Sequence, residues 1–247
     1  MTNLINKKLL FLAIIIVSYS ALLCEKLVFK IEYVGISVAD VEFERTNNNL
    51  NIKAQSGSLA NFFSISFDNR YNIVFDDEFK PKEYTKTIKQ KNFLENSINI
   101  YNYDTLKAEY FCSASDIYLH YPIKFNTRDF FSGLYYLRET ALDNSFFIDA
   151  AGIIWEVQSE VLNTEIIKTK LGKKNVKKVK ISFTQADPEK NNLNTQKLKS
   201  DILTNNLVNE DNVLFFWFTD DEKKIPIKAQ YTMSPFNVNW TIIKIEN

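Results

Sequence analysis

The sequence predicts a mainly β protein: a large curved antiparallel sheet, or a partly open β-barrel, wrapped around one central α-helix. Short segments in which apolar and polar residues alternate recur along most of the chain, which is the pattern of half-buried strands. Residues 128–140 depart from this pattern, with apolar side chains at helical spacing. A strongly twisted antiparallel sheet curls, and we expect this helix to fill its concave side.

Residues 1–24 have the layout of a secretory signal. Lys7 and Lys8 precede an apolar run, 9–24, that is shorter than the ~20 residues of a typical membrane-spanning helix. A charged pair, Glu25 and Lys26, ends the run abruptly. We therefore expect cleavage, and a protein exported to a bacterial cell envelope, either in the periplasm or tethered to a membrane.

Cys24 allows two interpretations of the processing site. A peptidase that prefers small residues could cut after Ser20 or Ala21, whereas a lipid-modified Cys24 would make the protein a lipoprotein held by its acyl chains. A small residue usually precedes a lipidated cysteine. Here the residue before Cys24 is the larger Leu23, which weakens the match to a lipoprotein signal. The second cysteine, Cys112, lies in a predicted strand and is expected to be a small buried hydrophobe without a disulfide.

The rest of the chain, 25–247, has the length of one β-rich domain. Basic and acidic residues number 30 each, and loss of the signal removes two lysines and no acid, so we expect no bulk attraction to nucleic acid. Residues 187–211 are rich in Asn, Lys and Asp without clear alternation, and we interpret them as a polar surface insertion that is partly mobile.

Alternation predicts the strands one by one. In residues 27–33 the odd positions are apolar, and a turn at Gly35 leads into the next strand. Residues 169–173 are predicted to be a hairpin tip, because Gly172 adopts a positive φ at little cost. The strands are expected to form a meander and to cover residues 27–33, 36–45, 51–55, 70–75, 83–89, 97–103, 106–112, 117–121, 146–149, 153–162, 165–170, 176–184, 213–219, 225–233 and 238–245.

The principal predicted helix, 128–140, is capped by Asn126 or Thr127, and a shorter turn is predicted at 59–63. The helix carries more aromatic surface than one buried face needs. It is either the plug of an ordinary core or one wall of an apolar ligand cavity. The side chains that would bind a lipid or another apolar ligand are Phe130, Phe131, Leu134, Tyr135 and Tyr136.

Residue types used in catalysis do not form a recognisable site in the sequence. The single histidine, His120, lies between Leu119 and Tyr121 in a predicted strand, with no His or Cys at metal-ligand spacing, so we expect neither a metal nor a cofactor. No nucleophile motif accompanies it, and we expect no enzyme. The alternative is a hydrolase that uses acidic residues brought close to His120 by the fold.

Two acidic clusters, 76–78 and 220–222, fit solvated hairpin tips better than paired catalytic carboxylates or a calcium loop. Lysines crowd residues 168–180. In 178–183 they alternate with apolar residues, which indicates the solvent face of a half-buried strand. The alternative is a basic strip that touches anionic lipid head groups or a surface polymer.

A set of segments in consistent order carries a family resemblance. They are Tyr-Val-Gly-Ile at 33–36 with Ala39, Tyr71, Pro81 with Tyr84, Tyr-Asp at 103–104, Asp-Phe-Phe-Ser-Gly-Leu-Tyr-Tyr-Leu-Arg at 129–138, and Trp-Phe-Thr-Asp-Asp-Glu-Lys-Lys-Ile-Pro at 217–226. Together they resemble a bacterial family of exported proteins, domain of unknown function 3108, over nearly the whole mature chain. Ala39 stands where a glycine is common, and Ser-Pro-Phe-Asn at 234–237 lacks the family's usual glycine. The resemblance implies an exported antiparallel sheet curved around a helix, and it supplies no catalytic residues.

Two hypotheses about function follow. In the first, the concave sheet and the aromatic helix of an envelope protein hold an acyl chain or another apolar segment, an idea that rests on analogy with curved-sheet scaffolds. In the second, a structural or assembly protein of the envelope has a filled core and binds another protein through an exposed strand or through residues 187–211.

Overall fold

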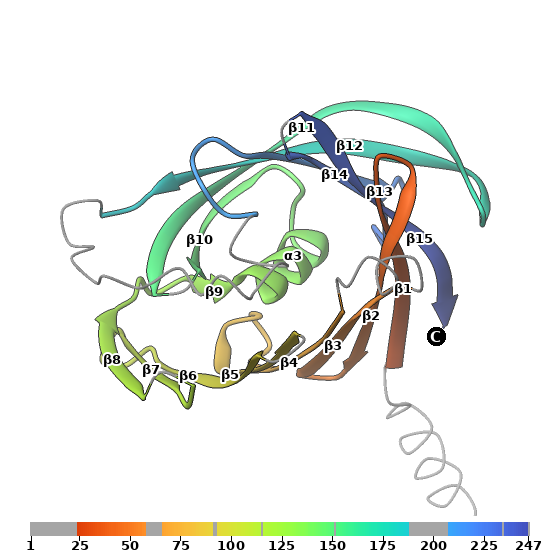
Figure 1. The fold of residues 1–247 in the computed structure, drawn as a ribbon. Helices are drawn as coiled ribbons and strands as arrows, with labels where there is room; N and C mark the ends of the chain where they lie inside the picture. The colour runs from red at the N-terminus through yellow and green to blue at the C-terminus, as the bar shows by residue number, and fades with distance from the viewer. Residues whose placement is uncertain are drawn as a thin grey trace, which may run out of the picture.

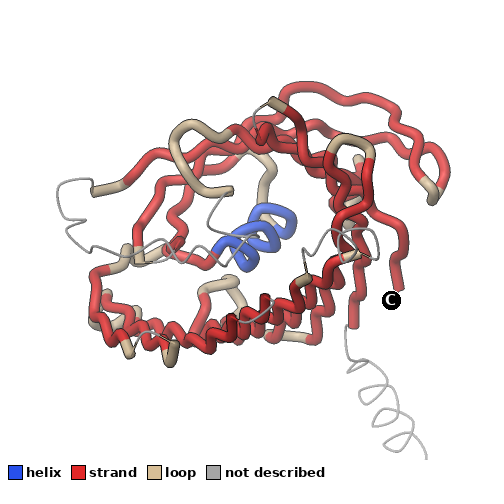
Figure 2. The backbone as a smooth tube through the Cα atoms, in the orientation of Figure 1, coloured by secondary structure: helices blue, strands red, loops and turns tan. Residues whose placement is uncertain are grey.

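The computed structural model describes residues 24–57, 66–90, 93–114, 116–150, 152–187, 207–233 and 235–246. The predicted signal before Cys24, the predicted turn at 59–63 and residues 188–206 of the predicted insertion lie outside this set. Within it, fifteen strands form one sheet and a single helix, α3 (Phe130–Glu139), lies inside. The predicted fold class is confirmed (Figures 1 and 2).

The strands follow the chain in a long meander, and their bounds are close to those expected from alternation. They are β1 (Cys24–Tyr33), β2 (Ile36–Thr46), β3 (Asn49–Ser56), β4 (Phe67–Phe75), β5 (Pro81–Gln90), β6 (Phe93–Asn102), β7 (Lys107–Cys112), β8 (Ile117–Pro122), β9 (Thr127–Asp129), β10 (Asn144–Ala150), β11 (Ile153–Thr169), β12 (Gly172–Gln185), β13 (Val213–Thr219), β14 (Pro226–Met233) and β15 (Phe236–Glu246).

The order of strands across the sheet makes it an almost closed ring. It runs from β8 back to β1, continues with β15 next to β1, and ends at β10 and β9. The two terminal strands of the sheet, β8 and β9, follow one another in sequence. In Figure 1, β2 to β8 lie below α3, β10 to β14 lie above it, and β1 and β15 join the two halves. The sheet therefore has one seam, between β8 and β9.

Alternation decides which face of each strand turns inward. In β2, Ala39, Val41 and Phe43 are buried, whereas the acidic residues between them point outward. Because successive side chains of a strand point to opposite faces, the inner set of every strand adds to one contiguous core. The hairpin tips also follow the sequence, with φ at +74° for Gly35 and +94° for Gly172.

The structure differs from the sequence-based expectation in β11. Two strands were expected, 153–162 and 165–170, but β11 is continuous over Ile153–Thr169. Its register with β12 shifts between Val161 and Asn163, which is the mark of a β-bulge at Leu162. A bulge reverses the parity of alternation, so one bent strand looks like two in the sequence.

The start of the helix also differs. Residues 127–129 form the short strand β9, which pairs in parallel with β10, and the helix begins only at Phe130. Its N-cap is Asp129, not Asn126 or Thr127, because the Asp129 Oδ1 atom accepts hydrogen bonds from the backbone N–H groups of Phe131 (2.9 Å) and Ser132 (3.1 Å). The Thr127 hydroxyl accepts instead from the Lys124 N–H, at 2.9 Å.

A buried carboxylate joins the two sides of the seam. Asp149, on β10, accepts hydrogen bonds at Oδ2 from the hydroxyls of Tyr101 (2.9 Å) and Tyr121 and from the side-chain amide of Asn99 (3.1 Å). Its Oδ1 atom accepts from the Gly152 N–H at 2.8 Å. All four side chains of this cluster are buried. Burial raises the pKa of the Asp149 carboxyl, and these hydrogen bonds oppose that effect. Side chains thus tie β6 and β8 to β10 where no backbone ladder does.

We expect Asp149→Ala to lower the free energy of unfolding by at least about 3 kcal/mol, because three buried donors lose their acceptor at about 1–3 kcal/mol each. Urea denaturation measures the loss, and hydrogen exchange should show faster opening of β8 than of β2. Asp68→Ala, which removes only the half-exposed partner of Arg70, is the control and should change stability by less than about 1 kcal/mol. Equal effects of the two variants would mean that the seam does not depend on Asp149.

Candidate functional site

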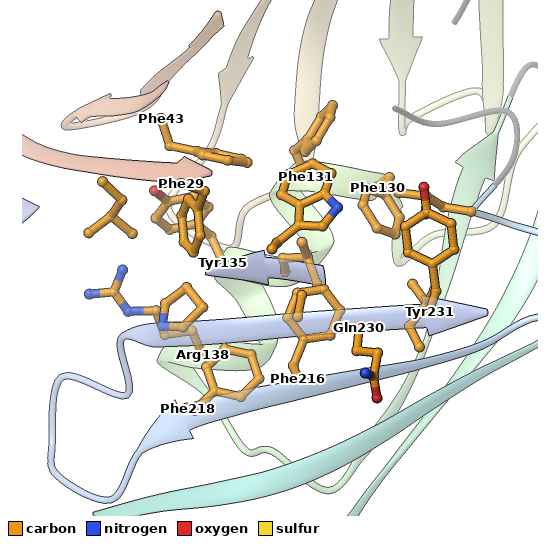
Figure 3. A pocket seen from close by; sticks show the side chains of 17 residues that line it. Phe29, Phe43, Phe130, Phe131, Tyr135, Arg138, Phe216, Phe218, Gln230 and Tyr231 are labelled. Carbon is orange, nitrogen blue, oxygen red and sulfur yellow. The ribbon is translucent and has the colours of Figure 1, made fainter. Parts of the chain in front are cut away.

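An apolar cavity lies between α3 and the inner faces of β1, β2, β13, β14 and β15 (Figure 3). Its free volume is about 60 Å³. Arg138 lies at one end and Tyr231 at the other. The cavity is lined by Leu27, Phe29, Phe43, Phe130, Phe131, Leu134, Tyr135, Arg138, Leu207, Leu214, Phe216, Phe218, Pro226, Ala229, Gln230, Tyr231 and Trp240.

The helix brings four of the five predicted ligand-binding residues to this cavity. Phe130, Phe131, Leu134 and Tyr135 share one face of α3 because they are spaced by one helical turn. Tyr136 is not among the lining residues. It lies on the other side of the helix, where its ring packs edge-on against Phe146 and the Arg128 guanidinium stacks on it at 3.5 Å.

The opposite wall comes from residues that the sequence analysis did not select. Phe216 and Phe218 project inward from β13, Trp240 from β15 and Phe29 from β1. Their alternation identifies them as inward-facing, but it does not tell which inward residues face the helix. The walls meet at the Phe43 ring of β2, whose centroid is 5.6 Å from that of Phe29 and 5.9 Å from that of Phe131.

The helix lies closer to one side of the ring than to the other, and Gly133 is the reason. A Cβ atom at this position would lie 2.8 Å from a ring carbon of Phe146 and 3.3 Å from a methyl group of Ile148, both on β10. Only glycine permits so close an approach of helix and strand. Because α3 packs tightly on β10, the unfilled space is left on the far face of the helix, where the cavity lies.

A buried ion pair closes one end of the cavity. The guanidinium of Arg138 donates two hydrogen bonds of 2.6 Å to the Glu25 carboxylate on β1, and its Nε donates to the Lys223 carbonyl at 2.7 Å. Both side chains are largely buried, at 8% and 16% exposure. Burial alone would lower the pKa of Arg138, but the hydrogen bonds and charge of Glu25 raise it. The charge at this end of the cavity is therefore already neutralised.

The first predicted acidic cluster, 76–78, forms the turn between β4 and β5. The Asp76 carboxylate accepts from the backbone N–H groups of Glu78 and Lys80, each at 2.9 Å. The turn presents the Glu78 carbonyl to Arg128, which donates to it from Nε (3.2 Å) and Nη2 (2.8 Å). Asp76 organises a turn that holds the start of the helix.

The second cluster, 220–222, does the same at the other end of α3. The Asp221 carboxylate accepts from the N–H groups of Lys223 and Lys224, each at 3.1 Å, and from the Thr219 hydroxyl at 2.8 Å. This turn presents the Lys223 carbonyl to Arg138. In both clusters the carboxylates that make these contacts shape hairpin tips, and the two tips hold the helix from opposite halves of the sheet.

The remaining candidate residues lie apart from the cavity. His120 is exposed on β8, with its Nδ1 3.7 Å from a carboxylate oxygen of Glu109. Cys24 is exposed at the start of β1, and Cys112 is buried in β7. Over the described ranges, no three His, Cys, Asp or Glu side chains come together as metal ligands would. The helix in those ranges, α3, lacks the length and apolar character needed to cross a bilayer.

We expect Glu25→Gln to lower the free energy of unfolding by about 3–5 kcal/mol, because it leaves the Arg138 guanidinium buried without its counter-charge. Urea denaturation measures this change. The double variant Glu25→Gln/Arg138→Met should recover part of the loss, since no unpaired charge remains. Lys177→Gln, which breaks the exposed pair with Asp220, is the control and should have an effect below about 1 kcal/mol. A Glu25→Gln effect as small as that of the control would contradict the anchoring role.

One solved structure supports this fold. A beta-barrel-like protein from Brucella abortus, of domain of unknown function DUF1849, superposes with a TM-score of 0.59 at 10% identity, covering 91% of this chain and 98% of its own. A candidate lipoprotein from Parabacteroides distasonis reaches a TM-score of only 0.31 at 10% identity, covering 90% of this chain and 95% of its own. No curated protein matches in sequence. The sequence profile of one family, described as protein of unknown function DUF3108, matches residues 28–237. The chain therefore belongs to the DUF3108 family.

Proposed function

We propose that this protein acts in the bacterial cell envelope, without catalysis, by holding an acyl chain or another narrow apolar segment between α3 and the sheet. The observation that carries the proposal is the composition of the cavity wall, which is almost wholly aromatic and aliphatic. The one charged lining side chain, Arg138, is already paired with Glu25. Such a wall offers dispersion contacts and burial of apolar surface, and few hydrogen bonds, to a ligand.

The size of the cavity narrows the class of ligand. Its volume of about 60 Å³ is well below the roughly 300–1,000 Å³ of pockets for drug-sized molecules. A single hydrocarbon chain suits such a slot better than a ring system. An acyl chain that exceeds this volume fits only if side chains of the wall move aside. Leu134 is suited to such a movement because it lines the cavity and is only partly buried.

Attachment to a membrane would place the cavity near its ligand. In this proposal an acyl group on Cys24, one of the two ways in which the signal could be processed, supplies the attachment. Cys24 is exposed at the edge of the ring, next to Glu25, which is fixed by Arg138. An acylated Cys24 would hold the cavity end of the molecule close to the lipid layer.

Native mass spectrometry of the protein purified from its own envelope, followed by organic extraction, tests the proposal. We expect a stoichiometric adduct of lipid size. Ala229→Ile should lower its occupancy at least about tenfold, a change that needs only about 1.4 kcal/mol of lost contact, because the added carbons occupy the slot between Phe216 and Trp240. Phe131→Ala should lower occupancy as well, with a loss of stability of about 3–5 kcal/mol.

Phe146→Ala is the matched control for Phe131→Ala. It removes an equally buried ring that packs on the other side of α3, away from the cavity. It should lower stability by a similar amount and leave the adduct in place. A bare polypeptide mass for the unmodified sequence, or equal loss of adduct in the two variants, would contradict ligand carriage.

A second candidate function, binding of another envelope protein, is favoured by the outer surface beside the seam. The terminal strand β8 carries Tyr118 at 57% exposure, and its neighbours β7 and β6 carry Phe111 at 41% and Ile100 at 47%. Terminal strands with exposed apolar side chains are ready sites for strand addition. In this second candidate function the core holds no ligand, and the predicted insertion supplies further contacts to the partner.

Removal of residues 191–206 separates the two functions. The deletion stops before Leu207 and Val208, which are buried, at 4% and 5% exposure, although the sequence analysis placed them in a surface insertion. A partner captured through the insertion is lost in this variant, whereas the adduct in the cavity persists. Tyr118→Arg tests the strand surface in the same way.

A further inference from the structure

A two-stranded ribbon projects from the ring at the end of β11 and β12 (Figure 1). β10 pairs with β11 only as far as Ser159, and β13 pairs with β12 only from Val176 onward. Residues 166–175, which we call the basic ribbon, therefore pair with each other and with no third strand. Ile167 and Leu171 pack against the core from one face of the ribbon, and Ile166, Lys168, Lys170 and Lys173 are exposed. The exposed side chains are therefore free to serve another purpose.

The basic ribbon carries positive charge that no ion pair within the described ranges balances. It contains Lys168, Lys170, Lys173 and Lys174 and no acidic residue. Among the described residues none of these four lysines forms an ion pair, whereas Lys177, just outside the ribbon, pairs with Asp220 at 3.0 Å. The ribbon thus presents charge of one sign.

One pairing in the ribbon is unfavourable for folding. Lys168 and Lys173 are directly opposite one another across the two strands. Like charges in this position destabilise a β-ladder. A local feature that acts against the stability of the fold is expected at functional sites, where a binding partner offsets it.

An exposed apolar side chain lies on the same face as this lysine pair. Ile166 is two residues before Lys168 on β11, so both project to one side of the ribbon. At 68% exposure, Ile166 is the most exposed large hydrophobic residue of the described chain. A surface that joins lysines without ion pairs in the described structure and an exposed isoleucine matches a partner with an anionic surface over an apolar interior.

We propose that the basic ribbon docks the protein on an anionic phospholipid bilayer, with Lys168 and Lys173 at the head groups and Ile166 inserted among the upper acyl carbons. Each lysine near an anionic membrane strengthens binding by about fivefold. The exposed Ile166 separates this partner from a soluble polyanion, which offers charge and no apolar layer. The proposal does not depend on the cavity or on its ligand.

Co-sedimentation with lipid vesicles tests the proposal, with Cys24→Ser in every protein so that no acyl group contributes. We expect binding to vesicles that contain phosphatidylglycerol, weak binding to pure phosphatidylcholine, and a decline with added salt. Lys168→Glu/Lys173→Glu should weaken binding to the anionic vesicles at least about 20-fold. Lys82→Glu/Lys107→Glu makes the same change of charge at exposed lysines of β5 and β7, and it should retain most of the binding.

Ile166→Ser decides between a bilayer and a soluble anionic polymer. Insertion predicts weaker vesicle binding for this variant at unchanged net charge and unchanged thermal unfolding, since Ile166 is exposed in the fold. Binding equal to that of the parent, or an equal loss in the two double charge reversals, would overturn the assignment. Preference for a soluble polyanion such as heparin over the vesicles would overturn it as well.

Discussion

The concave side of a curled fifteen-stranded sheet has to be filled. In the described part of the chain, one helix of ten residues, α3, lies there and packs among the inward side chains of the strands. A helix inside a ring has few backbone neighbours, so side chains must fix its position. Arg128, just before α3, binds the carbonyl of Glu78, and Arg138, in its last turn, binds the carbonyl of Lys223. These carbonyls belong to turns in opposite halves of the sheet. The helix consequently acts as a strut between the two halves, and the cavity depends on that position.

The turns that receive the arginines share a construction. Each has an aspartate whose carboxylate collects two backbone N–H groups, a residue with positive φ (Phe79 at +61° and Lys224 at +42°), and a proline that begins the next strand. The acidic residues organise the chain locally, and the carbonyl that they orient carries the long-range contact. This explains why an acidic cluster lies near each end of the helix.

The cavity results from asymmetric packing. Gly133 lets the helix approach β10 closely, and the space that remains on its other face is bounded by the inward aromatic rings of β1, β2, β13 and β15. The ring is held together differently at the seam. There β8 and β9 share no backbone ladder, and Asp149 joins the two sides through tyrosine and asparagine side chains. Backbone pairing closes the side of the ring beside the cavity, and a buried carboxylate closes the other.

The spacing of apolar residues by itself determined most of the strands, through period-two alternation, and the helix α3, through its departure from that alternation to helical spacing. Helical spacing drew attention to Phe130, Phe131, Leu134 and Tyr135, which line the cavity, but Tyr136 was selected with them and lies on the other side of the helix. Local pattern was misleading where the backbone departs from regular geometry, as at the bulge of Leu162 and at Asp129, whose capping role depends on the strand before it.

Only the tertiary structure decided which inward residues meet the helix, because Phe216, Phe218 and Trp240 look in sequence like any other core positions. The same holds for contacts between residues far apart in the chain, such as Glu25 with Arg138 and Tyr101 with Asp149, which are set by the order of strands around the ring. Alternation states which face of a strand is buried, and the closure of the sheet determines what that face is buried against.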